Sequence, residues 1–399
     1  VSMMFNEIEL SSVITDIAAG PFGSNLKVSC FVPYGFPIID GANLKGFKVT
    51  DNLTKFVTEE KARSLSRSIA RRGDVIITIS GTLGQIAYIP DDSMFEEYLC
   101  SQRQFRVSFD SSRVYVPYLV FYFHTNEGQG KILSFANQTG VPALSQPLKN
   151  FRKIRIQLPS YTEQRRIASV IEAINDKIEC NQKVNDNLQQ QAFAFFDRLM
   201  IEADNDNCTV SDYADLNPRR VLAKHQIARS IDMSQLSTSG AFPSGWEMKP
   251  FNGGMRFTNG DTLLARITPC LENGKTAFID FLNEGEVAFG STEYIVLAPR
   301  YDVPPEMLYC LARYPAFVDY AVKNMNGSSG RQRVSAETIG QFRLPKFDER
   351  SLLKFGKAVA PMFLKMRYNS LENIRLAELR DALLPKLMSG EIDVSDIQL

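Results

Sequence analysis

The stretch NGDTLLARITPCLENGKTAF, residues 259–278, has a close counterpart much earlier in the chain, where residues 72–89 read RGDVIITISGTLGQIAYI. Both begin with Gly-Asp, enter an apolar strand, pass through a polar turn with glycine and end in a second short strand. From Gly73 to Gly260 the spacing is about 187 residues, far longer than the repeat of any solenoid. The chain therefore contains the same local pattern twice, half its length apart.

Other segments repeat at nearly the same spacing. IQLPSYTEQ at 156–164 corresponds to FRLPKFDER at 342–350, and FFDRLM at 195–200 corresponds to LLPKLM at 383–388. An internal duplication is the economical interpretation of matches that share one offset. It predicts the order globule, long helix, globule, long helix.

The two expected globules, residues 1–157 and 203–345, are rich in short apolar segments separated by glycine and proline turns. The clearest predicted strands are 73–79, 260–267 and 293–299. Residues 114–125 favour a helix after Pro117, because proline suits the first turn of a helix. Each globule is therefore expected to be a mixed α/β domain.

Residues 158–202 and 346–399 have a different pattern, in which apolar residues recur every three or four positions. This spacing is typical of a long helix that pairs with another helix. We expect Thr162 to cap the first helix and Gly390 to end the second. The first apolar seam consists of Ile167, Ile171, Ile174, Ile178, Leu188, Ala192, Phe195 and Leu199. The second consists of Leu352, Phe355, Val359, Met362, Met366, Leu376, Leu379, Leu383 and Leu387.

Asparagines fill the gap in each seam: Asn181 and Asn185 in the first, Asn369 and Asn373 in the second. If the helices pair antiparallel, Asn181 faces Asn373 and Asn185 faces Asn369. Amides inside an apolar seam fix the register, since an unpaired amide there is penalised. The alternative is that these asparagines are solvated positions on an irregular helix.

A helix of roughly 38 residues is close to 57 Å long. An antiparallel pair of this length would hold the two globules at its ends, related by a pseudo-twofold axis. Two similar modules at a fixed separation suit two half-sites on a DNA duplex. The expected fold class is therefore α+β, with two mixed α/β domains joined by two long helices that form an antiparallel coiled coil.

Composition narrows the function classes. Lysine plus arginine and aspartate plus glutamate number 45 each, which argues against a protein that coats DNA by charge alone. Six scattered cysteines without a C-x-x-C pair, and only two histidines, make a zinc site unexpected and indicate reduced thiols in a cytoplasmic protein. The N-terminal residues do not resemble a signal peptide, and no apolar run has the length of a membrane span.

Motifs for catalysis are incomplete. Asn217-Pro218 lacks the second proline and the aromatic residue of an adenine methyltransferase motif, and Pro304-Pro305 is followed by Glu306. The GKT at 274–276 lacks the first glycine of a phosphate-binding loop, because Pro269 stands there. The acidic residues of the 91–97 loop have no following lysine and are interpreted as solvated. We therefore expect a chain that catalyses nothing.

The sequence resembles the specificity subunit of a type I restriction-modification system over nearly its whole length. The resemblance rests on residues 259–278 followed by GSTEYIVLAP at 290–299, and on RRGDVIITISGTLGQ at 71–85. LPSYTEQRRIASVIEAINDKIE at 158–179 and LRDALLPKLMSGEI at 379–392 extend it.

The resemblance implies that 1–157 and 203–345 are target recognition domains, each reading half of a split sequence in double-stranded DNA. The helices of 158–202 and 346–399 would be spacers that set the gap and dock two methyltransferase subunits, which restriction subunits then join. No cofactor is expected in this chain. S-adenosylmethionine would belong to the methyltransferase, and ATP and magnesium to the nuclease.

DNA contacts favour arginine, lysine, amide and hydroxyl side chains on glycine-containing loops. The candidates in the first domain are Ser80, Thr82, Gln102, Arg103, Gln138 and Thr139. Those in the second are Arg266, Asn273, Lys275, Ser328, Arg331 and Arg333. Each also fits an ordinary surface turn, and the recurrence of the Glu272–Asn273 segment in the family fits a framework role.

Two function classes remain open. A DNA-recognition subunit is favoured by amide- and arginine-rich loops at matched places in the two halves. The alternative is a protein-interaction scaffold whose helical rod is the working part. An enzyme fused to its own reader is disfavoured by the chain length and by the missing motifs.

Overall fold

The structure is a computed structural model that describes residues 6–137, 141–328 and 330–398. Contacts divide this described chain into two compact units. The first unit spans Val1–Ile174 together with Glu378–Leu399, and the second spans Asn175–Ala377. The division passes through both long helices, α5 (Tyr161–Glu202) and α10 (Glu349–Met388), so each unit contains a segment of each helix.

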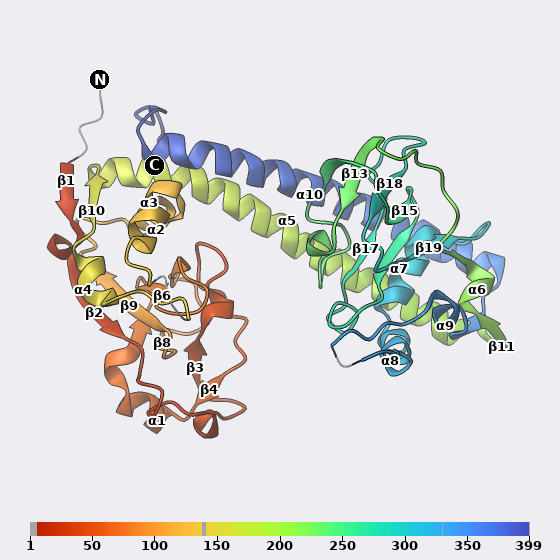
Figure 1. Cartoon of the computed structure of the whole chain (residues 1–399), viewed down its shortest axis with the longest axis horizontal. Helices are drawn as coiled ribbons and strands as arrows, with labels where there is room; N and C mark the ends of the chain where they lie inside the picture. Colours follow the sequence, from red (N-terminus) through yellow and green to blue (C-terminus); the bar gives the residue numbers. More distant parts are fainter. Residues whose placement is uncertain (1–5, 138–140, 329, 399) are drawn as a thin grey trace. The chain divides into compact units, whose positions relative to one another are not determined.

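In its described residues, the first unit contains two four-stranded sheets, with the orders β2-β9-β6-β7 and β4-β3-β8-β5 (Figure 1). A separate pair, β1 with β10, is antiparallel. The strands are β1 Asn6–Glu9, β2 Ile14–Ala19, β3 Phe36–Ile39, β4 Phe56–Val57, β5 Ile69–Arg71, β6 Val75–Thr78, β7 Ile86–Tyr88, β8 Glu97–Cys100, β9 Gln104–Phe109 and β10 Arg155–Leu158. The shorter α-helices are α1 Glu59–Ser64, α2 Val116–His124, α3 Asn126–Leu133 and α4 Pro147–Arg152.

The second unit, over the part that the structure describes, repeats this topology as β12-β19-β16-β17 and β14-β13-β18-β15, with β11 paired to β20. The strands are β11 Asp204–Thr209, β12 Ala214–Leu216, β13 Ile227–Ile231, β14 Glu247–Pro250, β15 Met255–Phe257, β16 Thr262–Ala265, β17 Thr276–Phe278, β18 Ala288–Gly290, β19 Tyr294–Pro299 and β20 Arg343–Lys346. The shorter α-helices are α6 Val210–Tyr213, α7 Pro305–Arg313, α8 Pro315–Lys323 and α9 Ala336–Gly340. The parallel pairing of β3 with β8 recurs as β13 with β18, so the duplication predicted from sequence is also a duplication of strand order.

The central strands are buried on both faces, which explains their unbroken apolar sequences. Val75 and Ile77 of β6 face the core that contains α2, while Ile76 between them faces a second core. In β16, Leu264 faces the core that contains α7, and its neighbour Leu263 faces a second core. α2 covers Val116–His124 with Pro117 in its first turn, as the sequence predicts.

The ends of the long helices have specific caps. Ser160 caps α5: its Oγ accepts a hydrogen bond from the Glu163 amide at 3.3 Å, and the Glu163 carboxylate accepts one from the Ser160 amide at 3.0 Å. The prediction of Thr162 as the cap was wrong, because Thr162 already lies inside the first turn. Gly390 ends α10 as predicted, with φ of 75°. The Gly390 amide donates to the Leu387 carbonyl and the Glu391 amide to the Lys386 carbonyl, the two bonds of a Schellman motif.

Side chains of the two long helices also pack into the cores of the domains. Ile167 and Ile171 of α5 lie in the same core as Leu387 of α10 and the side chains of α2. In the second unit, Phe196 of α5 and Phe363 of α10 lie in the core that contains α7. Each domain core therefore includes side chains from both long helices, a feature that pairwise coiled-coil packing does not require.

This shared burial shifts the apolar seam from the predicted positions. Phe195 is 40% exposed while Phe196 is buried, and Leu379 is 47% exposed while Leu384 is buried. The other seam positions are buried or half-buried. An α-helix has 3.6 residues per turn, so a strict heptad seam rotates along its surface. Near the helix ends the buried side therefore follows the domain core.

The Gly-Asp turn offers a test of backbone strain. Gly73 has φ of 84°, and a Cβ added there would meet nothing within 4 Å. Gly73→Ala should therefore destabilise the first unit by about 1–2 kcal/mol, the cost of a left-handed conformation. The matched control Gly130→Ala, inside α3 and also in open space, should stabilise by up to about 1 kcal/mol. Denaturant unfolding of the purified chain measures both changes, and an equal effect of the two substitutions would contradict the turn geometry.

Candidate nucleic-acid interface

The repeated Gly-Asp segments form the same turn in both domains. The amide of Gly73 donates to the Ile89 carbonyl at 2.8 Å, and that of Gly260 donates to the Ile279 carbonyl at 2.7 Å. The carboxylate of Asp74 accepts the Arg71 amide at 2.9 Å. The Gly-Asp turn is therefore framework, since these polar groups of the turn are satisfied within the domain.

The aspartate of this turn is buried in both domains. Asp261 accepts the Thr258 amide at 2.8 Å and pairs with Arg220 at 2.5 Å. Burial raises the pKa of Asp261 to about 6, although the Thr258 amide and the Arg220 guanidinium both oppose the shift. Burial also raises the pKa of Asp74. These carboxylates hold the turn, and no catalytic role is needed to explain them.

Identical backbone hydrogen bonds identify equivalent positions at the ends of the central strands. The Ile79 amide donates to the Arg103 carbonyl at 2.7 Å, and the Arg266 amide donates to the Glu293 carbonyl at 3.0 Å. Ile79 of the first domain is therefore the counterpart of Arg266, and Arg103 is the counterpart of Glu293.

A third equivalent position lies on the neighbouring loop. The Leu144 amide donates to the Ile79 carbonyl at 2.8 Å, as the Val334 amide does to the Arg266 carbonyl at 3.0 Å. Ala143, the residue before Leu144, forms an isolated β-bridge with Ser80. Arg333, the residue before Val334, forms the same bridge with Ile267, so Ala143 is the counterpart of Arg333. We call the three positions the strand-end triplet: Ile79, Arg103 and Ala143 in the first domain, and Arg266, Glu293 and Arg333 in the second.

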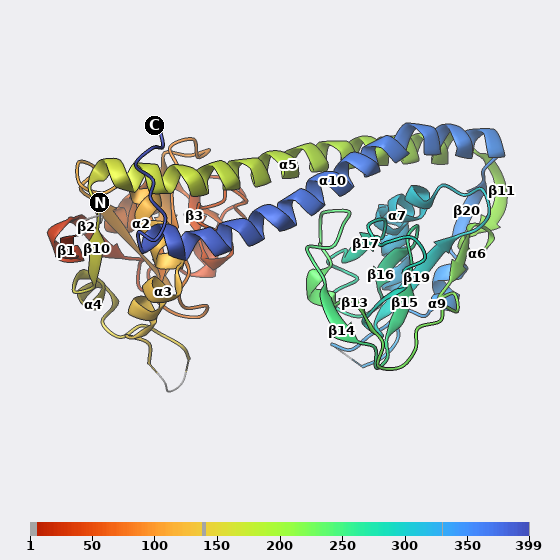
Figure 2. The ribbon, with the colours of Figure 1, turned by 90° about the horizontal axis from the view of Figure 1, so that it is seen from above.

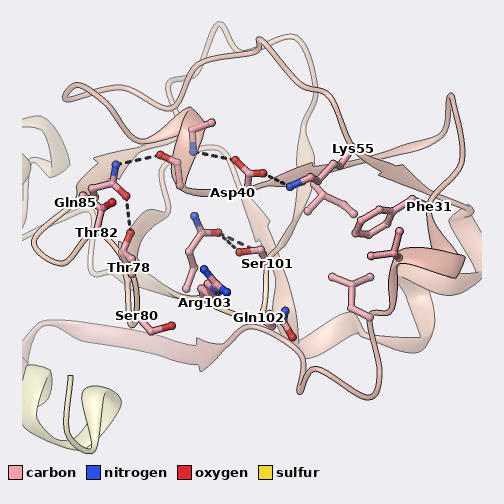
Figure 3. A pocket seen from close by; sticks show the side chains of 17 residues that line it. Phe31, Asp40, Lys55, Thr78, Ser80, Thr82, Gln85, Ser101, Gln102 and Arg103 are labelled. Carbon is pink, nitrogen blue, oxygen red and sulfur yellow. Dashed lines mark hydrogen bonds and ion pairs between the residues drawn. The ribbon is translucent and has the colours of Figure 1, made fainter. Parts of the chain in front are cut away.

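The first domain has a cleft of about 640 Å³ at this place. Four of the sequence candidates line it: Ser80, Thr82, Gln102 and Arg103 (Figure 3). The Arg103 side chain has no hydrogen bond or ion pair to another described residue. The other two candidates of this domain, Gln138 and Thr139, lie outside the described residues.

Polar partners occupy much of the remaining cleft wall. Lys55 donates to the Asp40 carboxylate at 2.6 Å, and Gln85 donates to the Gly41 carbonyl at 3.0 Å. Gln104 is completely buried, and its Oε1 accepts from the Ser101 amide and hydroxyl at 3.2 Å. The Gln104 Nε2 has no partner among the described residues, an uncommon state for a buried amide.

In the second domain the DNA-contact candidates differ in whether their side chains are already bonded to other residues of the domain. Arg333 is held by Glu293 through two of its three guanidinium nitrogens, Nε at 2.9 Å and Nη2 at 2.7 Å. The hydrogen bond from Arg333 lowers the pKa of Glu293, and Arg266 nearby lowers it further. The Nε of Arg266 is buried without a partner among the described residues. Ser328, Arg331 and Asn273 are exposed.

Lys275 has a bracing role that the sequence did not suggest. Its Nζ donates to the Met233 carbonyl at 2.7 Å, just as Gln85 of the first domain donates to the Gly41 carbonyl. Both acceptors open a short 3-10 turn that begins after an aspartate cap. Sequence reasoning also passed over Gln104 and Glu293. Aligning the two halves residue by residue around β9 and β19 would have identified Glu293 as the counterpart of Arg103 and Gln104 as the residue after Arg103.

The four asparagines of the helices lie in contact across the second-unit segments of α5 and α10, which run side by side (Figure 2). Asn181 Nδ2 donates to Asn373 Oδ1 at 2.8 Å, and Asn369 Nδ2 donates to Asn185 Oδ1 at 2.8 Å. Glu372 accepts from Asn181 at 2.7 Å and from Lys177 at 3.3 Å. This is the antiparallel facing that the sequence predicts, and the role of the pairs in setting register remains a prediction.

The described residues were also compared with the requirements of a metal site, a disulfide, an acidic catalytic cluster and a membrane span. Within those residues, no group of three histidine, cysteine or acidic side chains is placed to hold a metal ion. The six cysteines are free thiols. Glu97 of the acidic loop pairs with Arg63 at 2.6 Å and with Arg71 at 3.0 Å. No described helix is long and apolar enough to cross a membrane.

Comparison with known proteins identifies the class. Residues 32–190 match the family described as the type I restriction modification DNA specificity domain. The MjaIX specificity subunit of Methanocaldococcus jannaschii is 21% identical over 397 residues, covering 86% of this chain and 82% of that protein. The HindI specificity subunit of Haemophilus influenzae is also 21% identical, over 409 residues, covering 82% of this chain and 88% of that protein.

The fold has a solved counterpart. The type I restriction-modification S subunit from M. genitalium superposes with a TM-score of 0.57 at 16% identity, covering 96% of each chain. The likeness is one of fold, with two similar domains that share their cores with two long helices. Over most of its length the chain is similar to type I restriction-modification specificity subunits, and residues 32–190 match the family's specificity domain.

The pairing of Asn185 with Asn369 predicts that a single substitution destabilises the protein more than the double substitution does. Asn369 is buried, so Asn185→Leu should leave its amide without a partner and cost about 1–3 kcal/mol of unfolding free energy. The double variant Asn185→Leu/Asn369→Leu should recover most of that loss, because both polar groups are then removed. A double-mutant cycle by denaturant unfolding measures the coupling, and additive losses would show that the pair is solvated.

Proposed function

We propose that this chain is the DNA-recognition subunit of a type I restriction-modification complex. Each domain reads one half of a bipartite target in double-stranded DNA, and the helices of 158–202 and 346–399 set the gap between the halves. Two methyltransferase subunits dock on the helices, and restriction subunits complete the complex. The chain itself contributes no catalytic group.

One observation carries the proposal. The two domains share strand order and the hydrogen bonds of the Gly-Asp turn, yet their strand-end triplets carry different side chains. A framework that is kept while the groups at its loop ends change is what two different half-sites require. Two copies of a protein-binding domain on a scaffold would have no need for such unlike polar groups at equivalent positions.

The helices offer surface for the partner subunits. Within the second unit, Ile201 of α5 and Leu353 and Tyr368 of α10 are apolar or aromatic side chains more than half exposed. These side chains are accessible to a partner subunit. Cofactors belong to the partners in this proposal: S-adenosylmethionine to the methyltransferase, and ATP with magnesium to the nuclease.

Methylation mapping tests the proposal directly. The chain is co-expressed with the methyltransferase encoded beside it in a host that lacks DNA methylation, and N6-methyladenine is mapped across the genome. We expect a single split motif with one methylated adenine in each half. Absence of methylation from a soluble, associated pair of proteins would favour the scaffold alternative.

The spacer role of the helices has its own prediction. The double variant Asn181→Leu/Asn373→Leu should fold, because leucine suits an apolar seam, but should loosen the helix register. The complex should then methylate targets whose half-sites are separated by other gap lengths. Methylation of a library with randomised gaps measures this change, and an unaltered gap would show that the asparagines do not set the register.

A further inference from the structure

The strand-end triplet has the same formal charge in the two domains but a different arrangement. In the first domain, Arg103 is the one charged residue of the triplet, and Ile79 lies between it and the loop of Ala143. In the second, the triplet has two arginines and a glutamate, and Glu293 is bonded to Arg333. The first domain therefore presents an arginine with unused donors where the second presents an internal ion pair.

The surroundings of Arg103 leave those donors available. Asp40 is a carboxylate that lines the same cleft, but it accepts from Lys55 at 2.6 Å and from the Ala42 amide at 2.8 Å. In the second domain Asp232, the counterpart of Asp40, is also bonded to a lysine, Lys249, at 2.8 Å. This lysine–aspartate pair is thus part of the framework, and Arg103 has no ion-pair partner among the described residues.

The two glutamines beside Arg103 differ in exposure, because Gln102 is exposed and Gln104 is completely buried. The Oε1 of Gln104 accepts a hydrogen bond from Ser101. The Nε2 of Gln104 has no partner among the described residues. Its counterpart Tyr294 is satisfied, because its hydroxyl donates to the Ile231 carbonyl at 3.1 Å. Among the described residues, the cleft of the first domain therefore presents one exposed guanidinium without a partner, that of Arg103.

This chemistry selects a ligand with adjacent acceptors. In the major groove, guanine presents O6 and N7 side by side, and an arginine can donate to both. Adenine offers only N7 as an acceptor beside a donor, and the pyrimidines offer at most one acceptor there. The Ile79–Arg103 backbone bond holds the main chain of Arg103 at the strand end, and a guanidinium presented from there can make a bidentate contact.

We propose that the strand-end triplet sets the specificity of each domain, and that Arg103 reads a guanine in the half-site of the first domain. The inference rests on the proposed function and specifies one residue of it. The second domain reads its half-site with other chemistry, because Glu293 occupies the Arg103 position and orients Arg333.

The test uses the complete chain with its methyltransferase. The wild type, Arg103→Ala, Arg103→Lys and Arg71→Ala are assayed for binding to duplexes in which each base pair of the target is varied singly. Arg71 is the matched control, since it is an exposed arginine of the same domain outside the cleft and its loss removes the same charge. Co-purification with the methyltransferase and retained discrimination in the other half-site establish that each variant is folded.

We expect Arg103→Ala to weaken binding to the target about 5- to 150-fold, the equivalent of one bidentate base contact. The variant should lose preference at a single G·C pair in one half-site, while every other position keeps its preference. Arg103→Lys should retain most of the salt dependence of binding but lose part of the preference at that pair. Arg71→Ala should bind like the wild type.

Two results would overturn the inference while leaving the proposed function intact. Arg103→Ala could weaken binding equally on all sequences and lower the salt slope, which is the signature of a phosphate contact. It could also bind with unchanged preference at every position. Failure of the wild type to prefer any sequence would instead contradict the proposed function itself.

A variant with the exchanged triplet completes the experiment. The triple substitution Ile79→Arg/Arg103→Glu/Ala143→Arg gives the first domain the triplet of the second. We expect this variant to lose the guanine preference and to keep the preference of the second half-site. Retention of the guanine preference would show that the triplet does not set specificity.

Discussion

Each domain core depends on side chains from both long helices. In the first unit, Ile167 of α5 and Leu387 of α10 are buried together with the strand-and-helix core of the domain. The second unit does the same with Phe196 and Phe363. Because burial of large apolar side chains supplies most of the stabilisation of a domain, neither domain is complete without both helices. The helices are thus parts of two cores as well as partners of each other.

This dependence explains why the duplication is so regular. Each half of the chain must form the same sheets, the same turn and the same helix-facing surface, or one core would remain open. The Gly-Asp turn shows the regularity at atomic detail, with equivalent hydrogen bonds at Gly73 and Gly260. Between these fixed parts, the strand ends are free to differ, and the triplets there do differ. A specificity subunit needs this separation of framework from reading surface.

Much of the architecture could be predicted from the sequence because it depends on local pattern. The repeat spacing, the buried strands 73–79 and 260–267, the helix after Pro117 and the end of α10 at Gly390 all follow from apolar periodicity and backbone preference. The seam was predicted less well near the helix ends. There Phe196 and Leu384 are buried in place of Phe195 and Leu379, since the domain cores decide which side of the helix is covered.

In the candidate site, the difference between what the sequence predicts and what tertiary contacts decide is larger. The sequence alone determined that the chain is duplicated, that its halves are linked by helices with asparagines in their seams, and which loops carry polar groups. Only the tertiary structure decided which of those groups are free. Lys275 braces a turn, Arg333 is bound by Glu293, and Arg103 remains without an ion-pair partner among the described residues. The reason is physical: a polar residue type specifies what a side chain can bind, but its partners come from strands and loops distant in the sequence.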